Sequence, residues 1–87
     1  MSIGATQTEH QAVSFGADAD QFFRLGLMYS TGETVPADMV VAHKWFNIAA
    51  MRGSREAVNH RCEIASEMSS TEIAAAQRAA RTWLTRH

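Results

Sequence analysis

Residues 25–57 read LGLMYSTGETVPADMVVAHKWFNIAAMRGSREA, and this stretch decides the fold of the chain. A short segment that contains Gly32 and Pro36 separates two longer windows of residues that favour helix. Glycine at a helix end favours a left-handed stop, and proline disfavours helical backbone at the residue before it. The stretch therefore predicts a helical hairpin whose connection contains Gly32 and Pro36.

Capping residues set the bounds of the two hairpin helices. The first helix is predicted over residues 18–31 and the second over residues 38–52. A short polar side chain at a helix start accepts a hydrogen bond from a free amide, and glycine just past the end takes up a left-handed turn. The capping residues are Asp18 or Asp20 with Gly32 for the first helix, and Asp38 with Gly53 for the second.

Two further helices are predicted after the hairpin. Ser54 caps a third helix over residues 54–67, and Ser69 with Glu72 forms an S-x-x-E capping box that starts a fourth over residues 69–86. Connections this short imply antiparallel neighbours. The predicted fold class is therefore all-α, a stack of about four helices arranged as hairpins.

Residues 1–16 are weakly specified. They are rich in Thr, Gln, Ser and Gly and show no sustained hydrophobic period. We expect either a flexible arm or a short helix here. The folded unit is then a single domain over residues 17–87, because a chain of 87 residues is too short for two ordinary domains.

The second predicted helix has one broad apolar face. Apolar residues recur in it at the three- and four-residue intervals that place side chains on one side of a helix. That face consists of Ala42, Trp45, Phe46, Ala49 and Ala50, and the opposite side of His43, Lys44 and Asn47. We therefore expect the second group to face solvent.

Small residues, aromatic residues and glycines recur at fixed intervals through the hairpin. The pattern is Leu25-Gly26-x-x-Tyr29-x-x-Gly32, then Val35-x-x-Asp38-x-x-x-Ala42-x-x-Trp45-x-x-x-Ala49-Ala50-x-x-Gly53-x-x-x-Ala57. It resembles the Sel1-like repeat, an α/α hairpin repeat related to tetratricopeptide repeats. The resemblance covers residues 23–83. It departs at Gln21, where the family usually has alanine, and at Thr34, where it usually has a second glycine.

The resemblance implies a right-handed α/α hairpin stack and a role in protein–protein contact, typically in bacteria. The residues after the hairpin are similar to the segment that often follows the last Sel1-like repeat in bacterial members, so the third and fourth helices are expected to form a C-terminal cap. Those residues are Arg61, Ile64, Met68, Ser69, Ile73, Ala76, Gln77, Ala80 and Trp83. Some Sel1-like proteins have been linked to β-lactam binding or hydrolysis, but they are disulfide-rich secreted members, and this chain has one cysteine.

A lone repeat needs cover on its N-terminal side, because solenoid units bury their faces against neighbours. The first predicted helix is apolar on all sides, which is typical of a helix that is buried on more than one side or binds a partner. One reading is that the N-terminal arm folds over it through Val13 and Phe15. The other is a partner or self-association surface, which includes a homodimer. The residues of that candidate surface are Phe22, Arg24, Leu27 and Met28.

Charge is unevenly distributed, although the net charge is only −1. Residues 1–51 hold five acidic and two basic residues, whereas residues 52–87 hold four acidic residues and six arginines. Arg78, Arg81 and Arg86 are candidate contacts for an acidic partner, the alternative being a solvated helix face. Interleaved glutamates dilute the positive field, which disfavours nucleic acid as the partner.

Catalytic, cofactor-binding and metal sites are not expected. A single cysteine excludes an intramolecular disulfide and a four-thiolate zinc site, and the four histidines are scattered and expected on the surface. The sequence has no motif typical of a catalytic nucleophile or a phosphate-binding loop. Cys62 is expected to be a small buried hydrophobe, the alternative being a thiol activated by Arg61.

The expected function is a non-enzymatic protein–protein interaction or adaptor module. The alternatives are a hydrolase similar to the β-lactam-active Sel1-like proteins and a purely structural or self-associating subunit. No apolar run is long enough to cross a bilayer, so no membrane contact is expected. Residues 1–20 lack the basic start and apolar core of a secretory signal, which predicts a cytoplasmic location.

Overall fold

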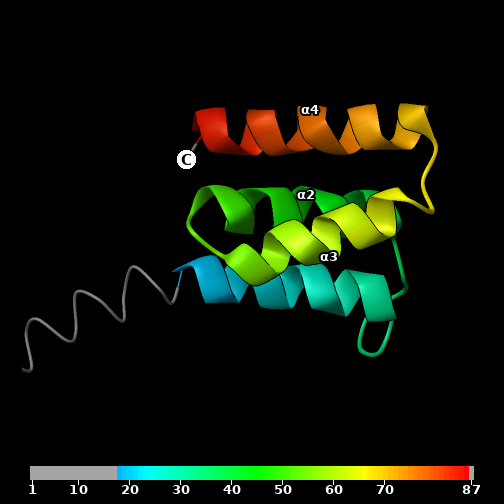
Figure 1. Cartoon of the computed structure of the whole chain (residues 1–87), viewed down its shortest axis with the longest axis horizontal. Helices are drawn as coiled ribbons and strands as arrows, with labels where there is room; N and C mark the ends of the chain where they lie inside the picture. Colours follow the sequence, from blue (N-terminus) through cyan, green and yellow to red (C-terminus); the bar gives the residue numbers. More distant parts are fainter. Residues whose placement is uncertain (1–17, 87) are drawn as a thin grey trace, which may run out of the picture.

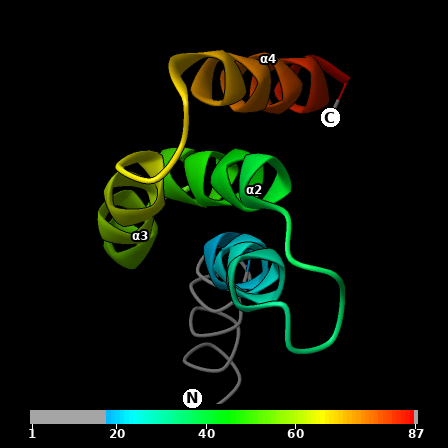
Figure 2. The same cartoon turned by 90° about the vertical axis from the view of Figure 1, so that its right-hand side faces the viewer.

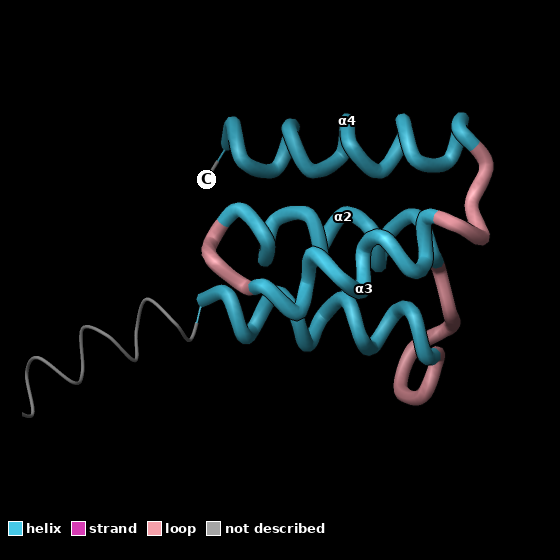
Figure 3. The backbone as a smooth tube through the Cα atoms, in the orientation of Figure 1, coloured by secondary structure: helices cyan, strands magenta, loops and turns pink. Residues whose placement is uncertain are grey.

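The computed structural model describes residues 18–86, and every regular element in that range is a helix (Figure 1). Residues 18–31 are helical and are called the first helix below. They are followed by α2 (Met39–Met51), α3 (Arg55–Ala65) and α4 (Ser70–Arg86), joined by loops (Figure 3). The all-α prediction is confirmed for this part of the chain, and the predicted arm, residues 1–16, lies outside it.

The central helix of the fold is α2. The end-on view in Figure 2 places the first helix and α4 on opposite sides of α2, with α3 beside it. Both α3 and α4 pack against α2, whereas α3 and α4, although consecutive in the chain, contact each other only weakly. The predicted second hairpin is therefore not closed by contacts between its own two helices. Helices α3 and α4 run antiparallel (Figure 1), but each of them packs on α2.

Small residues explain why α4 packs on α2. Ala76 and Ala80, one turn apart on α4, are fully or almost fully buried. Alanine lets two helices approach closely, so this face of α4 lies against α2. Trp83 continues the same face toward the end of α4 and is half-buried.

The predicted helix starts are confirmed in α2, α3 and α4. Each start has a side-chain oxygen that accepts a hydrogen bond from a free backbone amide, as capping requires. The bonds are Val41 N to Asp38 Oδ1 (3.1 Å), Ala57 N to Ser54 Oγ (3.1 Å) and Glu72 N to Ser69 Oγ (3.1 Å), the last returned by Ser69 N to Glu72 Oε1 (2.8 Å). The first helix covers the predicted residues 18–31, but its predicted cap is wrong, because Asp18 and Asp20 are themselves helical. The third helix also ends earlier than predicted, at Ala65.

Glycine has two separate roles in the hairpin. Gly32 and Gly53 have positive φ angles of 72° and 108°, which confirms both predicted left-handed stops. Gly26 instead lies inside the first helix, where an added Cβ would overlap the Phe46 ring of α2. The missing side chain of Gly26 thus allows the first helix and α2 to approach closely.

The core lies between the first helix, α2 and α3. Its buried members are Phe23, Ala42, Phe46, Ala49 and Ala57, and Phe46 is completely buried. The expectation that His43 faces solvent is wrong, since its exposed fraction is 3%, and Ile48 is also completely buried. Because the first helix, α3 and α4 cover α2 on several sides, little of its surface faces solvent. This explains why the side chains of His43 and Ile48 are both buried.

Candidate functional site

An aromatic cluster joins the first helix, α2 and α4. The rings of Phe22 and Trp45 are stacked with centroids 5.7 Å apart, and Trp83 forms T-shaped pairs with both, its centroid 5.1 Å from that of Phe22 and 5.7 Å from that of Trp45. The guanidinium carbon of Arg52 lies 5.7 Å from the Phe22 centroid. Two indoles therefore contact the half-buried Phe22 ring from within the described residues. Contacts of Val13 and Phe15 lie outside them.

The four residues of the candidate surface on the first helix do not form one patch. Phe22 belongs to the aromatic cluster, while Leu27 packs against the core. Arg24 is exposed and forms an ion pair with Asp20 over 2.9 Å. Arg24 and Met28 are one turn apart and share a side of the helix, with Met28 half-buried. The residues predicted to form one self-association surface thus lie in different surroundings: Phe22 in the aromatic cluster, Leu27 against the core, and Arg24 in solvent.

A second surface, called the acidic hollow, lies where the first helix meets α2 and α3. Leu27, Met39 and Ile64 supply its apolar lining, and Glu63 and Glu67 contribute two carboxylates. Its other lining residues are Ser30, Thr31, His60 and Ser66. Its volume is about 580 Å³. Apolar lining combined with two carboxylates fits an amphipathic group that carries positive charge.

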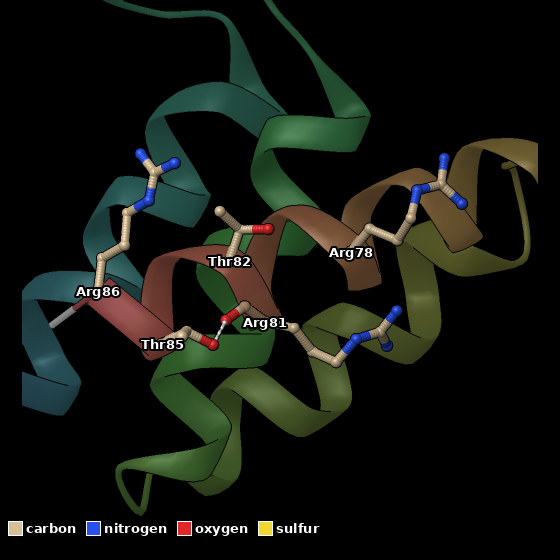
Figure 4. Close-up of a pocket in the computed structure, with 5 residues that line it drawn as sticks. All are labelled: Arg78, Arg81, Thr82, Thr85 and Arg86. Atoms are coloured by element: carbon tan, nitrogen blue, oxygen red, sulfur yellow. Dashed lines mark hydrogen bonds between the residues drawn. The ribbon is translucent and has the colours of Figure 1, made fainter.

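A third surface, called the arginine face, lies on α4 and is shown in Figure 4. Arg78, Arg81 and Arg86 lie there around Thr82 and Thr85, and all five residues are exposed. The structure thus brings together the three arginines that the sequence marked as contacts for an acidic partner. They surround a shallow depression of about 430 Å³.

The two threonines of the arginine face were missed by sequence reasoning. The hydroxyl of Thr85 donates a hydrogen bond to the backbone oxygen of Arg81 over 2.8 Å, as drawn in Figure 4. The signal was available in the spacing, because positions 78, 81, 82, 85 and 86 follow the helical i, i+3, i+4, i+7, i+8 pattern.

The charges on these two surfaces are not neutralised within the described residues. The ion pairs in residues 18–86 join Arg24 to Asp20 and Arg52 to Asp18. Arg78, Arg81 and Arg86 therefore have no carboxylate partner in this range, and neither Glu63 nor Glu67 has a cationic one. Like charges that lie close together on a surface repel each other weakly, so each surface gains from a partner of opposite charge.

His43 is the buried polar residue of the core region. Its Nδ1 atom is buried without a hydrogen-bond partner. Burial lowers the pKa of His43 below 6.5, and the positive charge of Arg61 lowers the pKa further. Arg61 itself donates a hydrogen bond to Asn47 Oδ1 over 2.7 Å, which links α3 to α2. The arrangement favours a neutral imidazole.

Cys62 is exposed, so the expectation of a buried cysteine is wrong. Its neighbours Asn59 and Glu63 are exposed as well, whereas His60 and Arg61 of the same polar run are half-buried and contact the hairpin. Among residues 18–86 no three His, Cys, Asp or Glu side chains converge on a position that could hold a metal ion. None of the described helices has the length and apolar character to cross a membrane.

Comparison of the chain with protein-family models, with curated proteins and with solved structures gives no match. The resemblance to Sel1-like repeats therefore rests on the residue pattern of the chain.

Proposed function

We propose that this chain is a non-enzymatic protein-interaction module with one Sel1-like α/α hairpin, formed by the first helix and α2, and a cap formed by α3 and α4. The roles of the glycines support this assignment. Gly26 permits close approach to Phe46, and Gly32 and Gly53 end the two helices with positive φ. These are the places where an α/α repeat needs a residue without a side chain.

The position of α3 also supports a repeat-like arrangement. Its His60 ring lies 5.0 Å from the Phe23 ring and 5.4 Å from the Phe46 ring, so it contacts both helices of the hairpin. In α/α solenoids each unit packs against the unit before it. Helix α3 packs against the preceding hairpin in the same way. Helix α4 differs, because it packs on α2 and contacts α3 only weakly.

The arginine face carries the proposal of an interaction function. Three guanidinium groups are exposed there without a carboxylate partner in residues 18–86. Arginine is enriched in protein interfaces because its planar head forms paired hydrogen bonds with carboxylates and its stem packs on apolar surface. A surface of this kind binds a partner without any chemical step.

The test is capture followed by reconstitution. The full chain is immobilised and exposed to a lysate of its source organism, retained proteins are identified, and binding is measured again by calorimetry with both components pure. We expect a saturable complex with fixed stoichiometry. If no retained protein binds in the purified system, and the chain also does not bind itself, the proposed function is contradicted.

A self-associating subunit is a second candidate, and one observation favours it. The chain carries both the arginine face and the acidic hollow, whose charges are opposite. Light scattering after gel filtration at several concentrations distinguishes a self-associating chain, whose mass rises with concentration, from a module that binds only other proteins.

A further inference from the structure

We infer that the arginine face of one copy of this chain binds the acidic hollow of a second copy, which deepens the proposed interaction function by naming its partner. Three uncompensated arginines lie on one surface and two uncompensated glutamates on the other. Complementary potentials on two surfaces favour their association and fix its orientation.

The chemistry of the two surfaces also matches. Leu27, Met39 and Ile64 give the acidic hollow an apolar lining beside Glu63 and Glu67. An arginine side chain has an apolar stem and a charged head, so it can cover such a lining while its guanidinium reaches a carboxylate. A neutral polar side chain lacks the charge, and a lysine lacks the planar head that forms two hydrogen bonds with one carboxylate.

The two surfaces are on different sides of the molecule. The arginine face belongs to α4, which packs on one side of α2, while the acidic hollow is lined by the first helix and α3 together with the start of α2. Figure 2 shows α4 separated from the first helix by α2. One copy therefore cannot pair its own two surfaces, and binding between copies joins unlike surfaces, which builds a chain or a ring rather than a closed two-fold dimer.

Charge reversal tests the pairing directly. Wild type, Arg81→Glu and Glu67→Arg are compared by sedimentation velocity from micromolar to millimolar concentration at low salt. We expect wild type to grow beyond a dimer and each variant to associate about tenfold more weakly, because attraction becomes repulsion at one contact. An equimolar mixture of the two variants is expected to recover growth beyond a dimer. Their altered surfaces complement each other, and the unaltered arginine face of Glu67→Arg still fits the unaltered acidic hollow of Arg81→Glu.

Two matched controls separate this pairing from a general effect of charge. Arg55→Glu and Glu33→Arg make the same charge changes at exposed positions outside both surfaces. We expect both controls to associate like wild type, and circular dichroism to show equal helix content in all variants.

Three outcomes overturn the inference. They are a wild type that stays monomeric at every concentration, controls that weaken association as much as the test variants, and a mixture that gains no association. If any of them occurs while a purified partner protein still binds, the proposed interaction function stands and only the second copy is excluded as partner. If that partner binds wild type and not Arg81→Glu, the arginine face serves a different acidic protein.

Discussion

The rings of Phe22 and Trp45 lie nearly parallel, with 5° between their planes and 5.7 Å between their centroids. Trp83 meets the pair at angles of 77° and 74°. Offset stacked and edge-to-face pairs are the favourable arrangements of aromatic rings. One cluster thus fixes α4, and the arginine face that α4 carries, to the hairpin.

Trp83→Ala is expected to lower the free energy of unfolding by about 3 kcal/mol, because a large half-buried aromatic residue is lost from this cluster. Urea unfolding followed by circular dichroism measures the change. Thr82→Ala is the matched control, since Thr82 is the exposed neighbour on α4 and should change stability by less than about 0.5 kcal/mol. Equal effects of the two substitutions would show that α4 is not held by the cluster.

Gly26→Ala is expected to destabilise the fold by about 1–3 kcal/mol through overpacking. The added Cβ overlaps the Phe46 ring, which is completely buried, so the ring would have to shift against its neighbours in the core. In an exposed helix the same substitution would stabilise by about 1 kcal/mol, so the sign of the change is decisive. The double variant Gly26→Ala/Phe46→Leu should lose less than the two single changes combined, because the smaller side chain relieves the overlap.

His43 makes stability depend on pH. Its folded-state pKa is lowered below 6.5, first by burial and then by Arg61. Well above pH 6.5 His43 is neutral in both states and contributes no pH dependence. As the pH falls below that value, the unfolded chain binds a proton that the folded protein excludes, so stability decreases down to the folded-state pKa, by at most about 1.4 kcal/mol per pH unit.

His43→Leu should remove this part of the decrease. Urea unfolding at a series of pH values between neutral and about 5, where few carboxylates titrate, compares the variant with wild type. The Nδ1 atom that has no hydrogen-bond partner is also removed, so we expect the variant to lose little stability at neutral pH. If the free energy of unfolding of His43→Leu falls with pH as steeply as that of wild type, the pH dependence arises from other titrating groups.

The local features of this fold could be predicted from the sequence, and the contacts between distant segments could not. Asp38 and Ser54 cap their helices as expected, because a cap depends on residues three positions apart. The burial of His43 and Ile48 depends on α2 becoming the central helix, which no local pattern encodes. The arginine face could be predicted from the sequence, since its residues follow a single helical period. The acidic hollow could not, because it combines residues of three separate elements.

The capping box of α4 gives the last prediction. Ser69 and Glu72 exchange two hydrogen bonds, of 3.1 Å and 2.8 Å, where the chain leaves α3 and enters α4. Ser69→Ala is expected to cost about 1 kcal/mol in the free energy of unfolding. Glu72→Ala removes the reciprocal bond and a negative charge from the first turn, where a carboxylate also interacts favourably with the helix dipole. If the two residues act as one motif, the double variant should lose less than the sum of the single losses, whereas strict additivity in urea unfolding would show that each side chain caps the helix independently.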